Sequence, residues 1–91
     1  MDNEIIVNKR KLFQRIVNNP RNVRFETLTM LATSFGFKLV RIQGSHHIFS
    51  HSQIDEIINL QDIQGMAKPY QVRQLLGLIE RYNLSLEGEM S

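Results

Sequence analysis

The chain has 91 residues and a formal net charge of +2, and its length favours a single small domain. A domain of this size buries only roughly 60–65% of its unfolded surface, which excludes a deep interior pocket and favours an open groove or sheet face that binds a polymer. The absence of cysteine excludes a disulfide framework and a thiolate metal site.

The first periodic segment predicts an amphipathic helix over about residues 8–18. Its apolar residues recur along one stripe, at Leu12, Phe13, Ile16 and Val17. Pro20 disfavours helical geometry in the residue before it, so the helix should end at Asn18-Asn19. The outward positions are basic, and we expect them to form a solvated helix face made of Lys9, Arg10, Lys11 and Arg15.

A second helix is predicted over about residues 24–35. One of its faces is apolar and consists of Phe25, Leu28, Leu31, Ala32 and Phe35. Gly36 follows this helix at the place where a left-handed C-terminal cap requires glycine.

After Gly36 the hydrophobic period changes from helical to strand-like. Residues 37–43 mix apolar and charged side chains and predict a strand, and Gly44-Ser45 predicts a turn. Residues 46–50 and 54–60 predict two further strands. The connections are short, which is typical of a three-stranded antiparallel meander.

Residues 61–68 are expected to form a loop, and Pro69 is suited to the first position of a last helix over 69–83. The predicted fold class is therefore α+β, with the helices at 25–35 and 69–83 on one sheet face and the other face open. We expect one domain over residues 1–91, consisting of the extension 8–18, a core over 24–84 and a polar, frayed tail over 85–91.

The charge of the chain is unevenly distributed. Residues 1–24 hold six Lys and Arg against two acidic residues, whereas residues 25–91 hold five against seven. This asymmetry fits either a solvated helix face or a patch for phosphate, and composition does not choose between them. No apolar run approaches the roughly 20 residues that cross a bilayer, and the acidic start lacks a signal-peptide pattern. We therefore expect a soluble, cytoplasmic protein with no membrane partner.

Three histidines fall close together, at His46, His47 and His51. Neighbouring residues of a strand point to opposite faces, so His46 and His47 cannot easily chelate one ion. No cysteine is present, and the first carboxylate after them is that of Asp55. We expect neither a metal site nor a cofactor.

The Gly44-Ser45 turn should place His46 and His47 at the rim of the sheet, with Lys38 and Arg41 on the adjoining strand. A typical imidazole titrates near about pH 6.5 and can take and return a proton, while cations hold a phosphate beside it. This is a minimal set of groups for cleaving RNA through its own 2′-hydroxyl. The plainer interpretation is that these are polar strand residues with one histidine packed in the core.

The segments Phe35-Gly36-Phe37, Val40-Arg41 and Gly44-Ser45-His46-His47-Ile48-Phe49 resemble the pattern of HicA toxins, and the resemblance covers about residues 24–84. It implies a fold similar to a double-stranded RNA-binding domain, mRNA cleavage without a metal, and inhibition by a HicB-like antitoxin. Gly44 and Ser45 match the family's turn. The catalytic histidine carried over is His46 or His47, because the family varies at this pair; the Gly-Ser-His core slightly favours His46.

Two features depart from the family pattern. Many HicA proteins lack an N-terminal helix like residues 8–18, and many carry a Pro-x-His segment after the third strand, where this chain has Lys68 and Tyr70. Candidate phosphate contacts are Lys38, Arg41, Lys68 and Arg73. The alternative functions are a non-catalytic RNA-binding module, which reads phosphates and 2′-hydroxyls, and a protein-interaction adaptor that docks a partner on the open sheet face.

Overall fold

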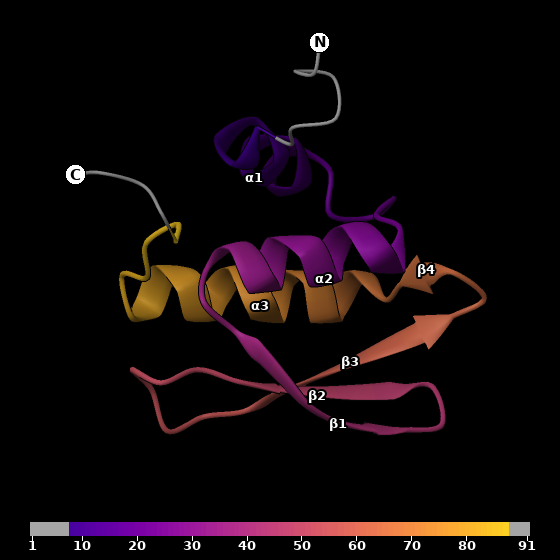
Figure 1. Cartoon of the computed structure of the whole chain (residues 1–91). Helices are drawn as coiled ribbons and strands as arrows, with labels where there is room; N and C mark the ends of the chain where they lie inside the picture. The colour runs from indigo at the N-terminus through magenta and orange to yellow at the C-terminus, as the bar shows by residue number, and fades with distance from the viewer. Residues whose placement is uncertain (1–7, 88–91) are drawn as a thin grey trace, which may run out of the picture.

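The computed structural model describes residues 8–87 and has an α+β architecture of three helices and a four-stranded antiparallel sheet (Figure 1). The helices are α1 (Lys9–Asn18), α2 (Phe25–Ser34) and α3 (Pro69–Arg81). The strands are β1 (Lys38–Gln43), β2 (His46–Ser50), β3 (Ile58–Ile63) and β4 (Met66–Ala67). The predicted α+β class with an antiparallel sheet is thus confirmed, and the sheet has one strand more than the three expected.

The strands follow one another across the sheet in chain order, β1-β2-β3-β4. Helices α2 and α3 lie on the same face of the sheet, and α1 lies on the side of these helices that faces away from the sheet (Figure 1). The opposite sheet face has no helix among residues 8–87 to cover it. None of the helices in this part of the chain has the length and apolar character needed to span a membrane.

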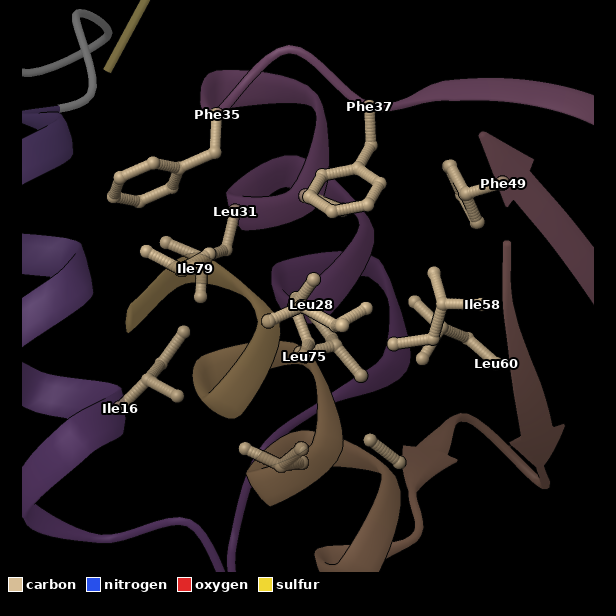
Figure 2. Packing of buried hydrophobic residues seen from close by; sticks show 14 of the residues in the cluster. Ile16, Leu28, Leu31, Phe35, Phe37, Phe49, Ile58, Leu60, Leu75 and Ile79 are labelled. Atoms are coloured by element: carbon tan, nitrogen blue, oxygen red, sulfur yellow. The ribbon is translucent and has the colours of Figure 1, made fainter. Parts of the chain in front are cut away.

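One hydrophobic core joins the helices to the covered sheet face (Figure 2). Leu28 and Leu75 bring α2 and α3 together, and Phe49 and Leu60 contribute from the sheet; all four are fully or almost fully buried. Ile16 extends this cluster into α1. The N-terminal helix is therefore packed onto the domain by Leu12 and Ile16, while Val17 of its predicted apolar stripe and its basic residues are exposed.

Two tight turns connect the strands. Gly44 has a φ of 58° and Ser45 stays at negative φ, which is the pattern of a type II′ hairpin turn with glycine first. In the next hairpin Gln64 has a φ of 51° and Gly65 a φ of 88°, and positive φ at both central residues is typical of a type I′ turn.

The second of these turns corrects the sequence prediction of a third strand over 54–60 and a loop over 61–68. Strand β3 instead runs from Ile58 to Ile63, and Met66–Ala67 returns beside it as β4. Glutamine is unusual at the first position of a type I′ turn, where Asn or Asp normally marks the hairpin. The Asp62 carboxylate, which accepts a hydrogen bond from the Gly65 N–H at 2.7 Å, helps to hold the turn closed.

The C-terminal boundary also differs from the prediction. Helix α3 ends at Arg81, and Asn83 adopts a φ of 53° while the Leu84 N–H reaches back to the Ile79 carbonyl. The expected frayed tail is wrong for its first residues, since Leu86 is buried and the Glu87 N–H donates to the Ser34 carbonyl at 2.7 Å. Residues 88–91 of that predicted tail lie outside the described part of the chain.

The loop between β2 and β3 is held to the end of α3 by Glu56. Its carboxylate accepts hydrogen bonds from the Tyr82 hydroxyl and from the Arg81 guanidinium, the latter at 3.2 Å. The bond to Glu56 raises the pKa of Tyr82, because deprotonation would place a second negative charge beside the carboxylate. This contact lies at the opposite end of the sheet from the β1–β2 turn that precedes the histidine pair (Figure 1).

Candidate functional site

The alternation of side chains along β2 places His46 and His47, between which the sequence did not decide, on opposite faces of the sheet. Phe49 belongs to the main core, so it and His47 point toward the helices, and the ring of His47 meets that of Phe25 edge-on at a centroid distance of 4.7 Å. His46 and Ile48 therefore point to the open face. Ile48 is buried but lies outside the main core, which explains why it resembles a core residue in the sequence.

His46 is held by one defined partner. Its Nδ1 lies 3.1 Å from Oδ1 of Asn59, which is on the neighbouring strand β3. An amide oxygen only accepts, so Nδ1 carries the proton and donates it, and in the neutral ring Nε2 keeps its lone pair. The residue is partly exposed, and it lies on the open face.

Cationic side chains share this face with His46. Arg41 and Asn59 lie opposite Ile48 on its two sides, so each is a diagonal neighbour of His46, at a typical separation of roughly 7–8 Å between backbones. Lys38 lies opposite Ser50 on the same face of the sheet. The structure therefore brings the predicted residues Lys38 and Arg41 onto the face of His46, and both are exposed.

Ser45 fixes the turn that carries the histidines. Its carbonyl accepts a hydrogen bond from the Asp62 N–H at 2.9 Å, and its hydroxyl accepts one from Nε2 of Gln61 at 3.1 Å. Gly44, the other turn residue, is exposed and has open space around it. The turn is consequently tied to β3, and His46 begins its strand at a defined position.

His47 occupies the helix side of the same rim. Its Nδ1 lies 3.2 Å from the Ser45 carbonyl, which can only accept, so this ring too donates from Nδ1 and leaves Nε2 free. Its other neighbour is the apolar ring of Phe25. Its environment thus differs from that of His46, which has cations along its own face.

The remaining two sequence candidates do not join His46. Lys68 is the N-cap residue of α3, and its Nζ lies 5.8 Å from the centroid of the Tyr70 ring. Arg73 is an exposed residue of α3. Because α3 covers the opposite sheet face, Lys68 and Arg73 belong to a different surface of the domain (Figure 1).

Sequence reasoning missed Asn59, whereas the plainer interpretation of one histidine packed in the core holds for His51. Asn59 belongs to no motif, and only the register of β2 against β3 places it beside His46. His51 is buried and structural: its Nε2 lies 2.8 Å from the Phe35 carbonyl, its Nδ1 accepts from the Gln53 N–H at 3.0 Å, and its ring packs edge-on against Phe37. It therefore closes the end of β2 onto the α2–β1 connection.

Within residues 8–87, no group of three or more His, Asp or Glu side chains is arranged as a set of metal ligands. Comparison of the chain with protein-family models, with curated proteins and with solved structures gave no match. The side chains around His46 are therefore the observation from which a function can be inferred.

Proposed function

We propose that this chain is a HicA-type endoribonuclease, with a fold similar to a double-stranded RNA-binding domain, that cleaves messenger RNA without a metal and uses His46 as the general base. The main support for the proposal is the geometry of His46. Asn59 holds Nδ1, so the free Nε2 is presented on an open sheet face beside Arg41. Asn59 would position the ring, in the way that a hydrogen bond to one imidazole nitrogen sets the role of the other.

The reaction is an internal transesterification. Nε2 of His46 takes the proton of a ribose 2′-hydroxyl, the 2′-oxygen bonds to the adjacent phosphorus, and the bond from phosphorus to the 5′-oxygen breaks. The leaving oxygen takes up a proton, and the products are a 2′,3′-cyclic phosphate and a 5′-hydroxyl. Arg41 would stabilise the charge that develops on the phosphate oxygens, and Lys38, which lies farther along the same face, would contact a neighbouring phosphate of the strand.

RNA is preferred over DNA because the nucleophile belongs to the substrate. DNA has no 2′-hydroxyl, so a site with a base and cations but no other activated nucleophile suits ribose alone. The test is incubation of the purified chain with messenger RNA in the presence of a chelator, and we expect cleavage. RNA that binds but stays intact would favour the alternative, an RNA-binding module that uses the same face.

The cations of the open face give a prediction for RNA affinity. Replacement of Arg41 or Lys38 by glutamine should weaken RNA binding regardless of sequence, and each loss of one phosphate contact should lower the salt slope by about 0.7 for a single strand. The measurement is the affinity for RNA over a series of salt concentrations. Arg81→Gln is the matched control, because it removes the same charge next to Glu56, far from His46. A slope equal to that of the control would assign Lys38 and Arg41 to the solvated surface.

The resemblance to HicA toxins also suggests a HicB-like antitoxin that covers the catalytic face. An acidic partner would be steered to the cations of this face. In a complex with such an antitoxin, we expect amides of residues 44–51 to gain protection from hydrogen exchange. Protection restricted to α1 would contradict occlusion and would indicate docking on the N-terminal helix.

A further inference from the structure

A second polar surface lies between α1 and α2, away from the open sheet face. Two cavities, of about 470 Å³ and 480 Å³, lie along this junction and share Arg15 and Thr27 in their linings. The first is also lined by Asn19, Asn22 and Arg24. The second also contains Lys11. Arg15 and Thr27 border both cavities, so the two lie side by side, and we call them together the α1–α2 groove.

The charge of the α1–α2 groove has one sign. Lys11, Arg15 and Arg24 line it, and no carboxylate does so. The amides of Asn19 and Asn22 and the hydroxyl of Thr27 add uncharged donors. The groove therefore presents positive charge and neutral hydrogen-bonding groups beside apolar side chains, which include Leu12, Ile16 and Met30.

Two of these three cations, Lys11 and Arg15, have no partner for their charge among residues 8–87, and Arg24 has one exposed partner. No hydrogen bond or ion pair with another residue among 8–87 occupies the side-chain nitrogens of Lys11 or Arg15. Arg24 lies 3.7 Å from the Glu26 carboxylate, but both side chains are largely exposed, and an exposed pair of this kind contributes little. Lys11 and Arg15 are four residues apart on α1, so their side chains follow one another along the groove.

The groove meets the rim of the sheet where the histidines lie. Arg24 directly precedes Phe25, whose ring packs against His47, and Arg24 also pairs through its backbone with Met66 of β4. Met66 itself lines the first cavity. The first cavity therefore lies beside the helix side of the histidine rim, where His47 packs.

We propose that the α1–α2 groove binds the sugar-phosphate backbone of an RNA strand. Arginine, lysine, asparagine and threonine are side chains that commonly contact phosphate and sugar, and they fix the position of a strand without reading its sequence. The identification of the strand as RNA rests on the proposed function, whereas the phosphate chemistry rests on the groove alone. The N-terminal helix thereby acquires a role in substrate binding.

The test uses Thr27, because its side chain borders both cavities. Thr27→Glu places a carboxylate in the groove, and Thr33→Glu makes the same change at an exposed position near the other end of α2. An acidic residue in the first turn of a helix is favourable, so Thr27→Glu should fold, and thermal unfolding checks this. The probe is a 2′-O-methyl oligoribonucleotide, which the proposed reaction cannot cleave.

We expect Thr27→Glu to weaken binding of this probe by roughly tenfold or more, because a carboxylate facing phosphate is strongly unfavourable, and Thr33→Glu to change it little. The double variant Lys11→Gln/Arg15→Gln should lower the salt slope by about 1.4, and the matched double variant Lys9→Gln/Arg81→Gln should leave it nearly unchanged.

Equal affinities for Thr27→Glu and Thr33→Glu would overturn the inference. A polyglutamate peptide that binds the unaltered chain more tightly than the probe does, and loses this binding in Thr27→Glu, would also overturn it, since the groove would then be a site for acidic peptides. Cleavage by His46 is measured separately. If Thr27→Glu loses binding of the probe and the parent chain cleaves no RNA, the groove is upheld and the ribonuclease proposal is refuted. If the parent chain cleaves RNA and Thr27→Glu binds the probe as tightly as the parent does, the ribonuclease proposal is upheld and the groove is refuted.

Discussion

Replacement of His46 by alanine is expected to lower the rate of RNA cleavage by about 10²–10⁴-fold while the chain stays folded. This is the usual cost of removing a positioned general base. His46 is a partly exposed residue on the open sheet face, so its loss removes one hydrogen bond to Asn59 and little packing. The measurement is the rate of cleavage of a fixed RNA in the presence of a chelator, together with the midpoint of thermal unfolding.

His47→Ala is the natural control, because it removes an identical side chain one position along the strand. It should keep most of the cleavage activity and lose some stability, since the ring packs against Phe25. The cleavage rate of Asn59→Ala should lie between those of the parent and His46→Ala, because the proposed base remains but its ring is no longer held in one orientation. If His47→Ala alone abolishes cleavage, the base lies on the helix side of the rim; if neither variant changes the rate, the assignment of catalysis to this pair fails.

Gly36→Ala is expected to reduce the free energy of unfolding by about 2–5 kcal/mol. Two effects combine at this position. Gly36 has a φ of 94°, a backbone conformation that costs an L-residue roughly 1–2 kcal/mol. A Cβ atom there would also lie 2.8 Å from Nε2 of His51, and overpacking of this kind costs about 1–3 kcal/mol.

Gly65→Ala separates these two effects. Gly65 has a similar φ of 88°, but no heavy atom lies within 4 Å of the position its Cβ would take. It should therefore lose only the backbone contribution, about 1–2 kcal/mol. Denaturant unfolding of both variants measures the difference. Equal losses would mean that the buried His51 ring, bonded to the Phe35 carbonyl at 2.8 Å, moves aside at no cost.

Local signals in the sequence predicted much of the fold. The apolar stripes marked all three helices, Gly36 marked the end of α2, and the Gly44-Ser45 pair marked the first hairpin. The second hairpin was missed because its turn, Gln64-Gly65, lacks the usual Asn or Asp. Strand β4 has only two residues, too few for a periodic pattern to reveal.

The site was only partly predictable from the sequence. Strand alternation tells which residues share a face of the sheet, but it does not tell which of the two faces the helices cover. Both Ile48 and Phe49 are buried, so the sequence around them could not decide between His46 and His47. The contact of His47 with Phe25 joins residues far apart in the chain, and so does the bond of His46 to Asn59. Such pairings depend on tertiary packing and register, which no local pattern encodes.

The basic residues of α1 illustrate the same limit. The sequence favours a solvated helix face for them, and Lys9, Arg10, Lys11 and Arg15 are indeed exposed. Exposure does not distinguish a solvated residue from one that lines a groove. Only the packing of α1 against α2 places Lys11 and Arg15 along a groove that holds no carboxylate.

The most direct test of the central claim compares two oligonucleotides that differ at a single ribose. One carries a 2′-hydroxyl at the position that is cut, and the other carries a 2′-O-methyl group there; both are incubated with the chain and a chelator. If His46 activates the 2′-hydroxyl, only the first is cleaved, and its fragment ends in a 2′,3′-cyclic phosphate. Cleavage of both oligonucleotides at equal rates, or of neither, would contradict the proposed mechanism.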